Sequence, residues 1–307
     1  MARTPGKQAF MSRSDFAMPS RAISAIAGIA LAAFLLPAAA PAQTAPAADP
    51  AAQASAASAD ANAAFLSKAS ALYYNTTKQG LTGFDCAIHP DWANIFKTVQ
   101  KAKGTAPEDD DKPVALLNSV KITIHARMAG PGSGVDWNPP DPTTPPDQST
   151  TDLLNTMHQG MAQMLQGFLQ FWTPFVNGSV IPDSTAGLDV TKTETGHTIH
   201  AVDGTTSLTE VLDSDNVLKE FNVDMGGTKV SFDPTYKPTP NGLLVSNFSS
   251  LVQPAGGTPA QDQKMKVGVE YQTLKGFLIP QTLTMDVAGT GTFVFTFDSC
   301  TVNPPAQ

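Results

Sequence analysis

The sequence predicts an α+β fold in which helices cover one face of a curved antiparallel β-sheet. After residue 182, apolar and polar residues alternate in a succession of short runs, which is the pattern of half-buried strands. The connections between these runs are short, which favours an antiparallel meander over crossover units. A single sheet of about ten strands must curl or be covered on one face. Three helical stretches before the meander are available to cover it.

The region before the meander alternates between helical and extended patterns. Residues 60–79 place apolar side chains at helical spacing, and residues 81–88 then alternate as a strand. Pro90 suits the first position of a second helix, because a helix leaves its first N–H groups unpaired. Residues 119–128 alternate again and predict another strand. Helices and strands are therefore mixed in the first half of the chain.

The longest predicted helix spans residues 150–172, with Ser149 and Asp152 as capping candidates. One half of this helix is apolar and the other carries amides, with no formal charge after its first turn. The apolar half is interpreted either as a plain core stripe or as the lining of a cavity for an apolar ligand, because methionines and aromatic rings serve both purposes. The candidate cavity residues are Met157, Met161, Met164, Phe168 and Trp172.

A proline-rich insertion precedes this helix. Residues 129–148 hold six prolines and three glycines, which predicts an extended loop. The loop joins a strand to the helix that is expected to cover the sheet, so it is a candidate flap at a cavity mouth, with Trp137 as the residue that closes it. Trp137 could equally be a local packing anchor, and the loop an inert surface insertion.

The N-terminus predicts export. Four basic residues precede an uncharged apolar run over residues 22–41, and small residues follow up to Ala42, where cleavage is expected. We therefore expect a signal peptide at 1–42, an Ala/Pro-rich disordered linker at 43–59, and a single domain at 60–302 that contains the 129–148 loop. The mature chain would be periplasmic or secreted, without an integral membrane span.

Cys86 and Cys300 are the two cysteines of the chain. In an oxidising compartment an even number of cysteines favours a disulfide over two free thiols. A redox pair is the alternative, but it would use a much closer spacing. We expect a structural disulfide that ties an early strand to the last one.

Charge and motifs exclude several classes of function. The chain carries a net charge of -8 and has a sequence pI of about 5.0, which argues against nucleic-acid binding. His197 and His200, the closest histidine pair, would point to opposite faces of a strand, so no metal site is expected. No nucleophile elbow or phosphate-binding loop occurs. A carboxylate pair of the glycosidase type stays open, because folding and not spacing creates such pairs.

Several segments resemble one known family. They are the first helix with its sequence FLSKASALYY from Phe65, LKEFNVD from Leu218, VGVEY from Val267 and GFLIP from Gly276. Together they resemble the C-terminal half of LolA-like periplasmic lipoprotein carriers, over residues 192–300 and the first helix. The resemblance implies a strongly curved, incomplete β-barrel whose concave apolar face is covered by helices and takes acyl chains. No binding residue of that family is carried over, because no segment here matches its acyl-gating residues.

The expected function is therefore that of an exported, soluble, non-catalytic protein without a cofactor. We expect it to be a monomer that binds an acyl chain, a lipid or a lipidated partner in an apolar cavity. The alternative is a non-catalytic envelope interaction or structural protein whose core is filled by its own side chains.

Overall fold

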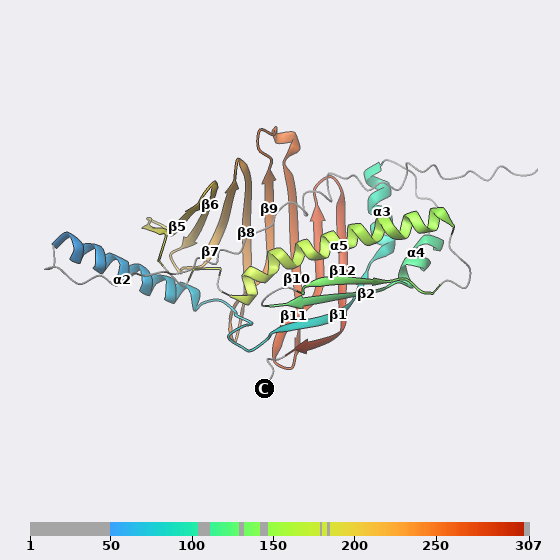
Figure 1. The fold of residues 1–307 in the computed structure, drawn as a ribbon, viewed down its shortest axis with the longest axis horizontal. Coiled ribbons are helices and arrows are strands. Elements are labelled where there is room, and N and C mark those ends of the chain that lie inside the picture. Colours follow the sequence, from blue (N-terminus) through green and yellow to red (C-terminus); the bar gives the residue numbers. More distant parts are fainter. Residues whose placement is uncertain are drawn as a thin grey trace, which may run out of the picture.

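The computed structural model describes residues 50–103, 111–128, 132–141, 147–178, 180–182 and 185–303 (Figure 1). The expected signal peptide and the first part of the expected linker lie outside these residues. The described helices are α2 (Pro50–Ser70), α3 (Trp92–Lys103), α4 (Asp111–Asn118) and α5 (Gln148–Asn177), with a short 3-10 turn, η1, at Pro259–Gln261. The described strands are β1 (Gly83–Pro90), β2 (Lys121–Arg127), β3 (Gly134–Asn138), β4 (Leu188–Lys192), β5 (Gly196–Asp203), β6 (Thr206–Asp213), β7 (Leu218–Met225), β8 (Thr228–Thr239), β9 (Gly242–Gln253), β10 (Gln263–Leu274), β11 (Phe277–Val287) and β12 (Gly291–Asn303).

The described strands form one open sheet in the order β3-β2-β1-β12-β11-β10-β9-β8-β7-β6-β5-β4. Every neighbouring pair is antiparallel, and β4 to β12 follow one another as a meander. The exception to chain order is β1, which pairs with β12 and so brings the two ends of the domain together. The predicted α+β class and antiparallel meander are confirmed, and β3 and β4 are free edges, so the sheet does not close.

Helix α5 packs across one face of this sheet (Figure 1). Its aromatic side chains contact rings on four strands, in the pairs Trp172–Phe84 on β1, Phe171–Phe232 on β8, Phe175–Phe248 on β9 and Phe168–Phe297 on β12. The strand residues that face α5 form the hydrophobic core of the described residues. This face is apolar because every second residue of each strand points to it.

The segment after α2 is fastened to the start of β9 by backbone hydrogen bonds. The Leu243 N–H donates to the Leu72 carbonyl at 2.7 Å, and the Tyr74 N–H donates to the Leu243 carbonyl at 2.9 Å. Gly242 permits this approach, since it has a φ of 114° and a Cβ there would lie 2.8 Å from the Leu72 oxygen. The chain after α2 therefore forms an isolated parallel β-bridge with β9, between Tyr73 and Leu243.

Several predicted boundaries differ in the structure. Helix α2 begins inside the segment expected to be a linker and ends at Ser70, nine residues before the predicted end. Pro90 ends β1 instead of starting a helix, and it is tolerated there because it lies at the last pairing position of the strand, opposite Phe295. Asp91 then accepts a hydrogen bond from the Asn94 N–H just as α3 begins.

Capping of α5 also differs from the prediction. Asp147 caps the helix, because its side chain accepts a hydrogen bond from the Thr150 N–H at 2.7 Å. Ser149 donates its hydroxyl to that same carboxylate, and Asp152 accepts from the Gln148 side chain instead of from a backbone N–H. The helix begins at Gln148, two residues before its predicted start, so the capping residue is also earlier than predicted.

The predicted disulfide is confirmed: Cys86 on β1 is bonded to Cys300 on β12. The two cysteines are 214 residues apart, so the bond closes a loop that includes nearly the whole domain. In the chain-entropy model such a bond contributes up to about 5 kcal/mol to the free energy of unfolding. None of the described helices is long and apolar enough to cross a membrane.

Candidate functional site

The five predicted cavity residues of α5 lie in the core. Their side chains face the sheet and are between 0% and 4% exposed (Met157, Met161, Met164, Phe168 and Trp172). Trp172 also donates its indole N–H to the Tyr271 hydroxyl at 2.8 Å, and that hydroxyl donates to the Val245 carbonyl at 2.6 Å. The structure thus brings these residues together as one closely packed stripe of α5.

Trp137, the proposed flap residue, lies on β3, a strand that forms inside the proline-rich segment and pairs with β2. Its half-buried ring stacks on His158 of α5 at a centroid distance of 5.3 Å and meets Trp92 of α3 edge-on at 6.2 Å. In this conformation Trp137 joins the sheet edge to two helices. The sequence analysis predicted an extended loop here, because prolines and glycines hide the short alternating run between them.

The apolar face of the sheet is larger than α5. Strands β8 to β12 have 11 to 13 residues each and are therefore roughly 40 Å long, whereas a helix with its side chains is about 10–12 Å wide. A row of half-buried apolar side chains continues across the sheet beyond the ring contacts of α5, at Met225, Val252, Met265 and Val287. In the view of Figure 1 the β9–β10 connection, which contains η1, extends above α5. Each of these four side chains packs against the core and keeps part of its surface exposed.

Glu210 is a buried carboxyl group on this same face. It is 1% exposed, and it lies on β6 between the cross-strand neighbours Ile199 and Phe221. Its Oε2 atom has no hydrogen-bond partner in the described part of the chain. Burial raises its pKa to about 8, so the side chain is largely protonated at neutral pH and presents an O–H donor.

Tyr236 lies on β8, which β7 separates from the strand of Glu210. Its hydroxyl is buried without a partner among the described residues. Burial raises the pKa of Tyr236, and the charges of Tyr73 and Glu210 raise it further. The Tyr73 ring meets the Tyr236 ring edge-on at 5.2 Å, but the Tyr73 hydroxyl is already occupied, since it accepts from the Leu218 N–H at 2.7 Å.

His197 on β5 is a half-buried polar residue at this end of the sheet. Its ring stacks on Phe65 of α2 at 4.0 Å, and its Nδ1 atom is buried without a partner among the described residues. Burial lowers its pKa, and the charge of Lys192 lowers it further, so the ring is neutral at pH 7. His200, which faces the other side of β5, lies 3.0 Å from the Thr209 hydroxyl. The two histidines therefore do not converge on one point.

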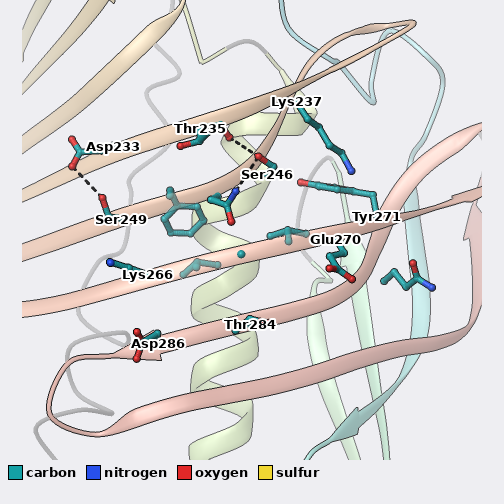
Figure 2. A pocket seen from close by; sticks show the side chains of 16 residues that line it. Asp233, Thr235, Lys237, Ser246, Ser249, Lys266, Glu270, Tyr271, Thr284 and Asp286 are labelled. Carbon is teal, nitrogen blue, oxygen red and sulfur yellow. Dashed lines mark hydrogen bonds between the residues drawn. The ribbon is translucent and has the colours of Figure 1, made fainter.

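The opposite, polar face of the sheet holds a broad groove over β8 to β11, with a volume of about 960 Å³ (Figure 2). Acidic, basic and hydroxyl side chains line it together, and Ser249 donates to Asp233 at 3.1 Å. The Lys237 ammonium lies 4.6 Å from the centroid of the Tyr271 ring. The groove offers hydrogen-bonding groups of both polarities, but neither a histidine nor a cysteine lines it.

A charged network lies at the β1–β3 edge. His125 Nδ1 is 2.7 Å from Asp85 Oδ1, and His125 Nε2 is 3.0 Å from Asp136 Oδ2. The hydrogen bond to Asp85 raises the pKa of His125, and this outweighs the effect of burial. Burial raises the pKa of Asp85, but hydrogen bonds from Arg127, His125 and Asn303 bring it below its usual value. Each acidic group in this network has a cationic partner, so it stabilises the edge without leaving a free acid or base.

Glu210 is not among the predicted site residues, although the sequence contains a signal for it. Leu208, Glu210 and Leu212 alternate along one strand, so an acid stands where the apolar face requires a hydrophobic residue. Tyr236 gave no such signal, because a β-bulge between Thr235 and Tyr236 shifts the alternation of β8.

In the part of the chain that the structure describes, no group of three or more histidine, cysteine or acidic side chains has a metal-binding geometry. No protein-family model, curated protein or solved structure matches the chain.

Proposed function

We propose that this protein is an exported, non-catalytic carrier that binds an acyl chain, or the acyl group of a lipidated partner, on the apolar face beside α5. In this proposal the face that α5 crosses is the concave side of a curved, incomplete barrel. The observation that carries the proposal is a set of half-buried apolar residues that pack against the core at one side of this face, Met225, Val252, Met265 and Val287. Apolar surface of this kind is typical of ligand and partner sites.

Two further observations support the proposal. The Cys86–Cys300 disulfide fits an oxidising compartment such as the periplasm, as the expected signal peptide at 1–42 also does. The resemblance of the β7, β10 and β11 segments to LolA-like lipoprotein carriers suggests the same class of ligand. We propose that the protein acts as a monomer, because a single chain supplies the whole apolar face.

A second candidate is a non-catalytic interaction protein with a filled core. The observation that favours it is the burial of the five α5 residues, of which the most exposed shows only 4% of its surface. In that case α5 would be a permanent part of the core, and the half-buried row would be ordinary rim surface. The two candidates differ in whether a free acyl chain binds to the folded protein.

The test uses the fluorescence of diphenylhexatriene, a hydrocarbon probe, with two matched variants. Met265→Gln places an amide in the half-buried row, and we expect it to weaken probe binding about fivefold, since it removes roughly 1 kcal/mol of apolar contact. The control is Val202→Gln, on the opposite face of β5, where Val202 is 62% exposed. We expect that variant to bind like the native protein. Absence of probe binding to the native protein would contradict the carrier and favour the filled core.

A further inference from the structure

The floor of the polar groove over β8 to β11 is a row of residues that strand pairing places side by side (Figure 2). They come from four neighbouring strands, none is charged, and all line the groove (Thr235, Asn247, Gly268 and Thr284). Because neighbouring strands are about 4.8 Å apart, the row is about 14 Å long. A Cβ at Gly268 would lie 3.1 Å from the Asn247 side-chain oxygen. The absence of a side chain at position 268 therefore keeps the floor low at its middle.

Charged side chains lie along both sides of this floor. On one side, strand pairing forms a second row about 7 Å away along the strands (Asp233, Ser249, Lys266 and Asp286). Lys237 and Glu270 line the groove on the other side. Within the described part of the chain, no residue forms a hydrogen bond or an ion pair with the side chain of Lys266, Glu270 or Asp286. These three charged groups can therefore bind a ligand without breaking an existing contact.

Two β-bulges add further polar side chains to the groove. Ser246 of β9 is the extra residue at the register shift between β8 and β9, and Gln281 of β11 is the extra residue at the shift between β10 and β11. Both line the groove, and the Ser246 hydroxyl donates to the Thr235 carbonyl at 3.1 Å. Bulges bend a strand and are frequent next to active sites, where they re-aim a side chain. Two bulges that open onto one groove therefore indicate a binding site.

We propose that this groove binds a neutral oligosaccharide that lies across the strands along the floor row. Each sugar hydroxyl can donate and accept hydrogen bonds. The groove supplies partners for both, since its carboxylates accept, its ammonium groups donate, and its hydroxyls and amides do either. A charged ligand fits less well, because carboxylates and ammonium groups are interspersed around the groove, and a charge of either sign would meet like charges. The site lies on the opposite face of the sheet from the proposed carrier site and does not depend on it.

An extended peptide is the other kind of ligand with many hydrogen-bonding groups. Peptides that bind to sheets commonly add a strand at a free edge. Strands β8 to β11 are inner strands, so their backbone groups are paired on both sides and only side chains face a ligand. None of the described residues that line the groove is an arginine, which excludes the arginine-cluster mode of peptide recognition. The groove therefore favours a saccharide over a peptide.

Isothermal titration calorimetry of the disulfide-bonded protein tests the proposal with cellotetraose, maltotetraose and N-acetylated chitotetraose, which are neutral. We expect at least one of them to bind the native protein. Gly268→Thr fills the middle of the floor with a residue that suits a strand, and it should weaken that binding about tenfold or more, because overpacking a fitted site is costly. Thr284→Val keeps the shape of the side chain but removes its hydroxyl, and it should weaken binding about fivefold.

Ser231→Thr is the matched control for Gly268→Thr, because Ser231 lies on the same face of β8 but does not line the groove. It should bind like the native protein. Absence of binding of all three sugars to the native protein, or unchanged binding in folded Gly268→Thr and Thr284→Val, would overturn the inference. Tighter binding of tetragalacturonate, of the chitosan tetramer or of a Gly-Ser octapeptide would also overturn it, and would assign the groove to an anion, a cation or a peptide. The carrier function would stand in each case, since it concerns the other face.

Discussion

At the scale of single residues, the burial of Glu210 makes stability depend on pH. The pKa of this side chain is about 8 in the folded protein, against an ordinary value of 4.5. Below pH 4.5 the carboxyl group is protonated in both states and has no effect. As the pH rises from there to about 8, the unfolded chain releases the proton first, so the free energy of unfolding decreases by up to about 1.4 kcal/mol per pH unit.

Glu210→Gln removes this titration while it keeps the shape of the side chain. We expect the variant to gain stability relative to the native protein between pH 5 and pH 8.5, by a few kcal/mol in total. Urea unfolding of both proteins at the two pH values measures the difference. The contributions of other titrating groups are the same in both proteins and cancel in the comparison. His125 is one of them: because its pKa is raised, its contribution to stability is lost as the pH rises through that pKa. A difference between the two proteins that is the same at both pH values would show that Glu210 ionises in the folded state as it does in water.

At the scale of elements, α5 is held by its apolar stripe. Met161 is 0% exposed, and Met161→Ala should lower the free energy of unfolding by about 2–5 kcal/mol through the lost contacts and the cavity that remains. Gln166→Ala, on the exposed side of the same helix, should change it by less than about 0.5 kcal/mol. Chemical denaturation measures both. If Met161→Ala costs less than Gln166→Ala, α5 is not part of the stable core.

The same variants bear on the predicted cavity. The idea that Met157, Met161, Met164, Phe168 and Trp172 line a ligand site stays a prediction, as does the role of Trp137 as a flap. If the acyl chain lies beside α5, folded Met161→Ala should bind it with the same affinity as the native protein. The unfolded fraction of the variant has to be subtracted in this comparison. A lower affinity of the folded variant would instead place the ligand between α5 and the sheet.

Some elements could be predicted from the sequence because their signal is local. The alternation of Phe293, Phe295 and Phe297 predicts one face of β12, and all three rings are buried there. The disulfide could be predicted because an even number of cysteines in an oxidising compartment favours a bond, even though the sequence does not give the distance between them. Pro90 was misplaced because the pairing of β1 with β12, which places it at a strand end, joins residues that are about two hundred positions apart.

The candidate site could be predicted even less well, because long-range strand pairing brings its residues together. Tyr236 and Glu210 lie on strands that are not neighbours, and the Tyr73 ring that meets Tyr236 comes from the segment after α2, which pairs with β9. An apolar helix such as α5 predicts burial, but its own sequence cannot distinguish a core stripe from a cavity wall. The width of the face that the helix covers is a property of the assembled sheet.

At the scale of the whole molecule, the proposal is that an apolar chain binds on the face of the sheet that α5 crosses. The most direct test is to purify the disulfide-bonded protein from the periplasm of an exporting host, extract it with organic solvent and identify the extract by mass spectrometry. The carrier account predicts an acyl lipid in stoichiometric amount with the native protein, and much less with Met265→Asp, in which a charge lies in the half-buried row. Folded native protein that yields no acyl lipid above the level of Met265→Asp would contradict the account.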